Sequence, residues 1–361
     1  MPINPAVLTK QIDHVWSDLA QRSEGDEQGL VRACSLTLVV LADAEENAAG
    51  VSGALAELMQ THPSRAIVVR VSAGDEDRIE ADVRAHCWMP AGRRQQICSE
   101  QIEVEASEAS LSELPSVLLP LIVPDLPAIL WCRSERASSS PVFGELRALA
   151  PRVIMDIEKF GQPGQALTQL AQHVSEHVTT DLSWTRLTRW REMIAQAFEN
   201  PVCRCRLADF RDIVVSYRAH ADKGIPASVF LMAGWLVNSL GWSWAGASVS
   251  AGDGPVLSLS QAGAKARVSF RCAGEGGAGS HLSRLEMATE GDEPVRITLE
   301  KEEEHLDIQV EAVNTQPIGM RVWFPPSQDA PLLGEELRVL RKDPIFESSL
   351  NTAAKIAALV G

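Results

Sequence analysis

Runs of apolar residues alternate with amphipathic segments along the first half of the chain. Residues 34–41 (CSLTLVVL) and 66–71 (AIVVRV) are continuous β-branched and leucine runs, typical of strands buried on both faces. Between them, the apolar positions of residues 44–60 recur on one face of a helix. The order strand, helix, strand favours a βαβ unit and therefore a parallel sheet.

Further apolar runs extend this pattern. Residues 128–132 (AILWC) and 152–156 (RVIMD) predict two more buried strands, and residues 78–88 and 95–104 alternate as in a half-exposed hairpin. Helices are predicted over residues 111–121, 143–149 and 164–177. We therefore expect residues 1–178 to form an α/β N-terminal domain with an open, mostly parallel sheet.

The pattern changes in the second half. Residues 227–240 (ASVFLMAGWLVNSL) are apolar nearly all round and predict a core helix. Short alternating runs separated by Gly, Asp and Pro follow between residues 248 and 324, which indicates an antiparallel sheet. One or two helices close the chain over residues 335–359. We expect residues 179–361 to form an α+β C-terminal domain with an antiparallel sheet.

Charge and length restrict the possible partners. The 361 residues carry 33 basic and 48 acidic side chains, a formal net charge of −15. Such an acidic surface repels phosphate backbones, so we expect no nucleic-acid partner. The first residues lack the apolar core of a signal peptide, and the longest apolar stretch, residues 225–237, is shorter than the ~20 residues that span a bilayer. We expect a cytoplasmic protein that does not interact with membranes.

The seven cysteines do not suggest a disulfide framework, because their number is odd and they are spread over a long chain. Cys203 and Cys205 form the only close pair. They could be two small buried or half-buried thiols, a redox switch or half of a metal site. Zinc would need two more ligands nearby, and the neighbourhood offers none, so we predict no metal.

Other motifs do not support a catalytic or cofactor site. Residues 274–279 (GEGGAG) match G-x-G-x-x-G, but a dinucleotide site needs a helix after this motif, and the following residues resemble a strand and turn. We expect a glycine-rich hairpin loop there. His173 and His177 lack the intervening pattern H-E-x-x-H and are expected to be structural. With no nucleophile elbow or P-loop either, the sequence predicts no catalytic residues and no cofactor.

The segment 181–201 is the most unusual part of the chain. It places Trp184, Arg186, Trp190 and Arg191 within one helix length, and Trp and Arg dominate the binding hot spots of protein interfaces. This composition suggests a contact surface for a partner. The alternative is a domain-bridging helix whose tryptophans pack inside and whose arginines pair with the abundant acids.

Local spacing and charge add detail to this segment. Arg186 and Trp190 are four residues apart and could stack, and Thr188 is a candidate N-cap. Residues 181–218 hold seven Arg and five acidic residues, so their balance is 7 − 5 = +2 within an acidic chain. This contrast could mark an anion site or a surface for an acidic partner.

These residues also carry a family resemblance. Residues 181–198 (DLSWTRLTRWREMIAQAF) resemble the DLNWtRLtpWRellAqlF helix of the glucose-6-phosphate dehydrogenase assembly protein family, OpcA. Three shorter blocks are similar in the same order: residues 124–131 (PDLPAILW), 152–156 (RVIMD) and 232–242 (MAGWLVNSLGW). The chain departs from the family pattern at Cys132, Ser183 and Arg189, where members usually carry Trp, Asn and Pro.

The resemblance implies a non-catalytic accessory protein of the oxidative pentose phosphate pathway. It would bind glucose-6-phosphate dehydrogenase, promote the active oligomer of that enzyme and activate it allosterically. The residues expected to form the contact surface or its rigid support are Trp184, Arg186, Trp190 and Arg191, with Asp125 and Trp131. The redox response of some family members is not carried over to Cys203 and Cys205.

Two other interpretations stay open at this point. An α/β enzyme or metabolite sensor could bind a sugar phosphate, since open parallel sheets commonly bind ligands at their strand ends. A nucleotide-binding regulator would instead use residues 274–279.

Overall fold

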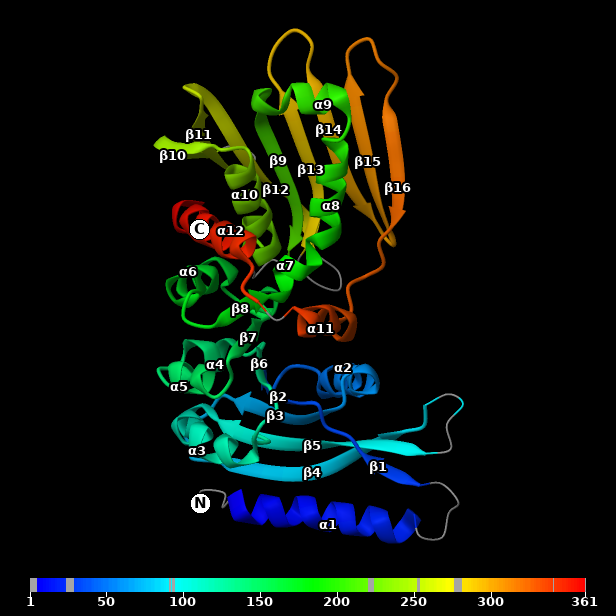
Figure 1. Cartoon of the computed structure of the whole chain (residues 1–361). Coiled ribbons are helices and arrows are strands. Elements are labelled where there is room, and N and C mark those ends of the chain that lie inside the picture. The colour runs from blue at the N-terminus through cyan, green and yellow to red at the C-terminus, as the bar shows by residue number, and fades with distance from the viewer. Residues whose placement is uncertain are drawn as a thin grey trace. The chain divides into compact units, whose positions relative to one another are not determined.

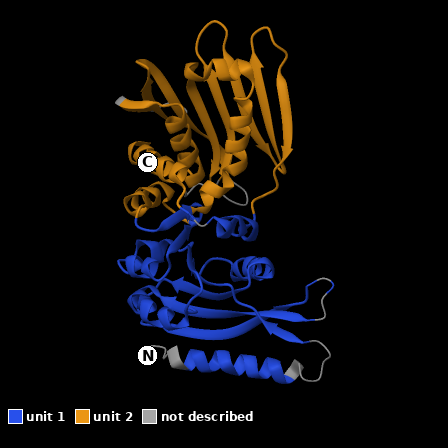
Figure 2. Cartoon of the chain, in the orientation of Figure 1, with its two compact units in different colours: residues 1–159, 176–180, 328–341 blue, residues 160–175, 181–327, 342–361 orange. Residues whose placement is uncertain are grey.

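The computed structural model describes most of the chain, and we divide it into two compact units (Figure 2). The described residues are 5–23, 29–90, 92, 95–219, 224–251, 254–275, 281–339 and 341–360. Unit 1 comprises residues 1–159, 176–180 and 328–341, and unit 2 comprises residues 160–175, 181–327 and 342–361. The units interleave along the chain, and the expected division between residues 178 and 179 stays a prediction.

Unit 1 is built on a mostly parallel sheet, as the sequence predicted. The strands are β1 (Leu30–Arg32), β2 (Leu36–Asp43), β3 (Ser64–Ser72), β4 (Ile79–Trp88), β5 (Gln96–Ser107), β6 (Ala128–Cys132), β7 (Arg152–Met155) and β8 (Val178–Asp181). Their spatial order is β1-β5-β3-β2-β6-β7-β8, and β4 pairs antiparallel with β5 in the expected hairpin. Strand β2 is buried on both faces over nearly its whole length, which explains its uninterrupted apolar run.

The strand order of this sheet matches that of doubly wound sheets, which bind ligands at a known position. Numbered from β2, the run β5-β3-β2-β6-β7-β8 has the order 3-2-1-4-5-6 of doubly wound dinucleotide-binding sheets. The chain reverses its direction of winding between β2 and β6, which pair in parallel. The carboxyl ends of β2 and β6 are therefore the topological switch point, where such folds open a ligand crevice.

The helices of unit 1 are short apart from the first two. Their bounds are α1 (Pro5–Ser23), α2 (Ala48–Thr61), α3 (Leu114–Leu118), α4 (Glu135–Ser139), α5 (Phe143–Ala148) and α11 (Asp329–Arg338), with 3-10 turns η1 (Glu108–Glu113), η2 (Leu119–Leu121) and η3 (Ile157–Lys159). Helix α1 packs against β4, and α2 packs against α11.

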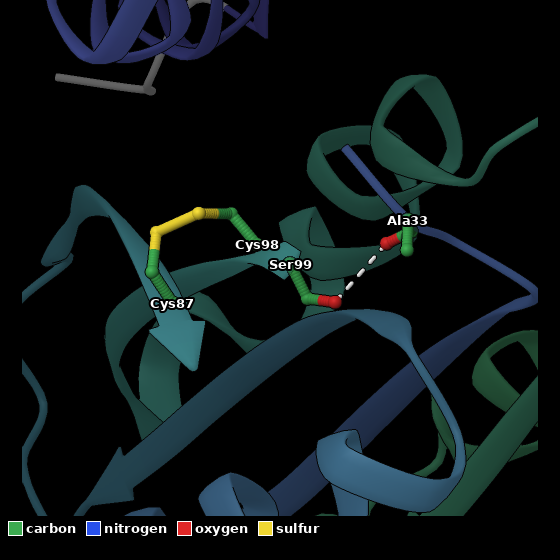
Figure 3. Close-up of a disulfide and its surroundings, with 4 residues drawn as sticks. All are labelled: Ala33, Cys87, Cys98 and Ser99. Atoms are coloured by element: carbon green, nitrogen blue, oxygen red, sulfur yellow. Dashed lines mark hydrogen bonds between the residues drawn. A yellow bond between two sulfur atoms is a disulfide. The ribbon is translucent and has the colours of Figure 1, made fainter. Parts of the chain in front are cut away.

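A disulfide joins β4 to β5, which the cysteine count did not lead us to expect. Cys87 and Cys98 are directly opposed in the hairpin, with their Cα atoms 4.0 Å apart (Figure 3). Beside it, the Ser99 hydroxyl donates to the Ala33 carbonyl at 3.0 Å. The spacing of the cysteines along the chain does not predict this bond, because only the strand register brings the two residues face to face.

Unit 2 is built on a second, mostly antiparallel sheet, again as predicted. Its strands are β9 (Phe210–Ala219), β10 (Ser243–Ala251), β11 (Pro255–Gln261), β12 (Ala264–Glu275), β13 (His281–Thr289), β14 (Val295–Glu302), β15 (His305–Ala312) and β16 (Ile318–Trp323). They lie in the order β10-β11-β12-β9-β13-β14-β15-β16. The pair β9 and β12 is parallel, an exception to the antiparallel expectation.

The helices of unit 2 are α6 (Pro163–His173), α7 (Leu182–Arg186), α8 (Thr188–Ala197), α9 (Pro201–Cys205), α10 (Ala227–Ser239) and α12 (Pro344–Val360), with the turn η4 (Leu207–Asp209). Helices α8 and α10 lie over the strands of the sheet, where α8 contacts β14 and α10 contacts β9 and β13 (Figure 1). The predicted core helix is α10, and a Cβ added at its Gly234 would meet the Ser349 carbonyl oxygen of α12 at 2.4 Å. Glycine thus permits close approach of the two helix backbones.

The glycine-rich segment does not close a hairpin. Residues 276–280 lie outside the described residues, but the strands on either side of them are not neighbours, because β9 lies between β12 and β13 and pairs with both. Strands β12 and β13 therefore do not form a hairpin with each other. The next described element after the glycine-rich motif is strand β13 rather than a helix, so the motif lacks the structural context of a dinucleotide fingerprint.

None of the helices in the described residues is both long and apolar enough to cross a lipid bilayer.

Candidate functional site

The Trp- and Arg-rich segment forms two short helices rather than one. Helix α7 ends at Arg186 and α8 begins at Thr188, with a break at Leu187. The side chain of Asp181 caps α7 by accepting a hydrogen bond from the Ser183 amide at 2.7 Å. The prediction that Thr188 is an N-cap was wrong: Thr188 is the first residue of α8, and Leu187 occupies the cap position without a side-chain bond.

The two tryptophans of this segment belong to the core of unit 2. Trp184 is 3% exposed and Trp190 is 2% exposed. The Trp184 ring packs against Phe346, and its indole N–H donates to Asp343 Oδ2 at 3.0 Å. The Trp190 ring meets Phe324 edge-on with ring centroids 6.4 Å apart. Buried side chains cannot touch a partner directly, so their possible role is support.

Arg191 stacks on Trp184, a pairing that the sequence analysis did not propose. The Arg191 guanidinium carbon lies 3.6 Å from the Trp184 ring centroid. Its Nη2 also donates to the Trp184 carbonyl oxygen at 3.4 Å and to Thr188 Oγ1 at 3.2 Å. In a straight helix, residues seven apart are separated by about 10 Å along the axis. The break at Leu187 brings them together, which spacing alone did not predict.

Exposed side chains of α8 and of the two short elements that follow it, α9 and η4, are charged or apolar. Arg189 is well exposed and pairs with Glu192 at 3.0 Å. Val202 is 37% exposed and Leu207 is 41% exposed. Arg204 and Cys205 are also exposed. We call this set, Arg189, Val202, Arg204, Cys205 and Leu207, the α8–α9 surface.

The two neighbouring cysteines have different environments. Cys203 is fully buried, and burial raises the pKa of its thiol. Cys205 is exposed, and both are free thiols. Within the described residues, no group of three or more His, Cys, Asp or Glu side chains is arranged to hold a metal ion.

The remaining predicted residues lie around β6 in unit 1. Asp125 is exposed in the turn before β6 and has a left-handed φ of 66°. Trp131 is fully buried, and the Arg133 guanidinium lies 4.6 Å from its ring centroid. Burial raises the pKa of the adjacent Cys132 thiol to about 12. Asp125 is accessible to a partner, whereas Trp131 is a core residue.

A cluster of ion pairs lies at the switch point of unit 1, and no sequence motif predicted it. Arg133, which follows β6, is 4% exposed and pairs with Glu46 and, at 2.8 Å, with Asp329. Burial raises the pKa of Glu46, and the charge of Arg133 opposes that shift. Arg136 binds Glu45 at 2.7 Å, so both guanidinium groups are engaged by carboxylates.

Carboxylates also line the crevice itself. A cavity of about 520 Å³ at these strand ends is lined by Asp43, Glu108, Glu135 and Arg136, among others. The residues after β2 contain no glycine loop, and the Asn47 side chain caps the first turn of α2 by accepting from the Ala49 amide. A pyrophosphate would need those free amides and a positive environment. The crevice therefore disfavours phosphate ligands.

Comparisons with known proteins place both halves of the chain. Residues 55–172 match the profile of a family described as the glucose-6-phosphate dehydrogenase subunit N-terminal domain, and residues 177–350 match the corresponding C-terminal domain. These profiles are designated OpcA_G6PD_assem and OpcA_G6PD_C.

Individual proteins that are similar to this chain carry the same family name. A protein of Nostoc punctiforme named "Putative OxPP cycle protein OpcA" is 29% identical over 55% of this chain and 42% of its own length. One of the same name from Synechocystis is 30% identical over 53% of this chain and 40% of its own length. The matched regions thus span less than half of each of these relatives. Among solved structures, the transcriptional regulator Gal80p from Kluyveromyces lactis aligns over 89% of this chain and 88% of its own, with 10% identity and a TM-score of 0.48.

Proposed function

Because the chain belongs to the OpcA family of glucose-6-phosphate dehydrogenase assembly proteins, we propose that it is a non-catalytic accessory protein of the oxidative pentose phosphate pathway. It binds glucose-6-phosphate dehydrogenase, promotes the active oligomer of the enzyme and raises its activity allosterically. An activator of this kind binds the active state more tightly than the inactive one. Typical couplings are about 1–3 kcal/mol.

The switch point of unit 1 is the observation that carries the non-catalytic part of the proposal. Its strand order is that of a dinucleotide-binding sheet, yet Arg133 and Arg136 are held there by carboxylates. Asp43 adds a further negative charge at the end of β2 and accepts a hydrogen bond from Ser134 at 2.5 Å. These features favour a scaffold over a nucleotide-dependent enzyme. They also disfavour a sugar phosphate in this crevice.

The α8–α9 surface is our candidate for the contact with the dehydrogenase. It combines exposed arginines with two exposed apolar side chains, Val202 and Leu207, a composition suited to a protein interface. Trp184 on α7 and Trp190 on α8 are packed in the core of unit 2 and hold these helices in place. In this account the tryptophans and Arg191 are support, and the α8–α9 surface makes the contact.

A pair of variants tests this assignment. Replacing the two apolar residues by Val202→Asp and Leu207→Asp places charges in the proposed interface and should abolish co-elution with the dehydrogenase on size exclusion. Ile318→Asp on β16 is the matched control, since Ile318 is an exposed apolar residue of the same unit, 55% exposed. It should bind as the natural chain does. A folded double variant that co-elutes normally would rule out this surface.

A further inference from the structure

A second pocket, separate from the crevice of unit 1, lies within unit 2. It has a volume of about 960 Å³, within the usual size range of small-molecule sites. It opens at the carboxyl ends of the parallel pair β9 and β12, where Tyr217 and Cys272 line it. The first turn of α6, the residues just before α10 and the last turn of α12 form its other walls.

Tyr217 gives this pocket an unsatisfied donor. Its side chain is 9% exposed, and it lies beside Cys272 in the strand register. Among the residues that the structure describes, none forms a hydrogen bond with its hydroxyl. Burial raises the pKa of Tyr217, so the hydroxyl keeps its proton and can donate. The hydroxyl faces the pocket without a described partner, so it can donate to an acceptor that a ligand supplies.

The start of α6 supplies further donors to the same pocket. The first intrahelical bond runs from the Ala166 amide to the Gln162 carbonyl at 3.1 Å, so the Gly164 and Gln165 amides precede it. Pro163 occupies the first turn, and no side chain caps this end. Both Gly164 and Gln165 line the pocket. An uncapped helix N-terminus attracts a negative group.

Crowding explains the glycine at this position. A Cβ added at Gly164 would lie 3.3 Å from the Ala357 Cβ and 3.4 Å from the Phe230 ring. Glycine thus lets α6 approach the other two helices without a side chain between them.

The rest of the lining decides which anion fits. Glu275 is the one charged side chain among the described residues that line the pocket, and no Lys or Arg is among them. Within this described part of the lining a doubly charged phosphate meets no counter-charge, which favours a singly charged carboxylate. Ile225, Phe230 and Val360 offer an apolar surface for the body of a ligand.

We propose that this pocket binds a monocarboxylic acid with an aliphatic or aromatic body. The carboxylate accepts hydrogen bonds from the Tyr217 hydroxyl and the first amides of α6, and the body lies against Phe230 and its apolar neighbours. This inference does not depend on binding to the dehydrogenase.

The test uses decanoate and 1-decanol as competitors against the fluorescent sulfonate 8-anilinonaphthalene-1-sulfonate. We expect saturable, single-site binding of the fluorophore to the full chain. Decanoate should displace it at a concentration about tenfold lower than decanol, because only decanoate offers a charged acceptor. Tyr217→Phe should weaken decanoate about tenfold and reduce its advantage over decanol.

A filling variant and its neighbour complete the test. Ala358→Trp, at an exposed position that lines the pocket, should abolish binding. Leu359→Trp, on the same helix but not in the lining, should leave it unchanged. Absence of saturable binding to the folded natural chain would overturn the proposal. So would equal displacement by decanoate and decanol, or normal binding by Ala358→Trp.

Discussion

The central guanidinium carbon of Arg191 lies over the Trp184 ring, 3.6 Å from the ring centroid. These residues are on two different helices, α7 and α8, which meet at Leu187. The stacking and the hydrogen bond from Arg191 to the Trp184 carbonyl oxygen hold α7 and α8 together. Helix α8 carries part of the α8–α9 surface, so these contacts support the surface that is proposed to bind the dehydrogenase.

Arg191→Ala should destabilise the protein by about 1–3 kcal/mol, because it removes a cation–π contact and two hydrogen bonds at a half-buried site. Urea unfolding followed by tryptophan fluorescence measures this loss. The matched control is Arg189→Ala on the same helix, whose exposed pair with Glu192 should contribute less than about 0.5 kcal/mol. Equal losses for both variants would contradict the structural role of the stack.

Asp343→Ala should lower the free energy of unfolding by about 2 kcal/mol or more, because the Asp343 carboxylate both caps α12 and accepts a hydrogen bond from Trp184. Its Oδ1 caps α12 by accepting from the Ile345 and Phe346 amides at 2.9 Å and 3.1 Å. Its Oδ2 accepts the indole N–H of Trp184, which the substitution would leave buried without this partner. Thermal unfolding of Asp343→Ala, Asp343→Asn and Trp184→Phe separates the two contributions. If Asp343→Ala is no less stable than Asp343→Asn, the capping account is wrong.

The free cysteines should differ sharply in reactivity. Cys205 and Cys272 are exposed and should react with iodoacetamide in the folded protein. Cys132 and Cys203 are buried, and burial raises the pKa of Cys132 to about 12, so they should react only after unfolding. Mass spectrometry of peptides after short labelling reads out each site. Fast labelling of Cys203 would revive the interpretation of Cys203 and Cys205 as a redox pair.

Most of the fold could be predicted because its strands and helices carry strong periodic patterns. The apolar run AILWC became β6 with the predicted bounds, and the alternating runs around residue 92 became the β4–β5 hairpin. Strands β1 and β8 were missed because they are short and lack a buried apolar run such as the one that predicted the equally short β7. The parallel pairing of β9 with β12 depends on contacts between distant segments, which local patterns do not encode.

The candidate sites were harder to predict than the fold. The sequence drew attention to Trp184 and Trp190, but residue type alone did not show that both side chains are buried. Two features required the tertiary structure: the ion pairs around Arg133 and the pocket beside Tyr217. Each gathers side chains from several elements, and none of them forms a motif along the chain.

The most direct measurement is the activity of glucose-6-phosphate dehydrogenase from the same organism, titrated with this purified chain. If the chain is an allosteric activator, we expect a saturable fall in KM for glucose 6-phosphate of at least about fivefold, which corresponds to about 1 kcal/mol of coupling. The two proteins should co-elute over the same concentration range. If the folded chain changes neither KM nor kcat at micromolar concentrations and does not co-elute with the enzyme, the proposed function is wrong.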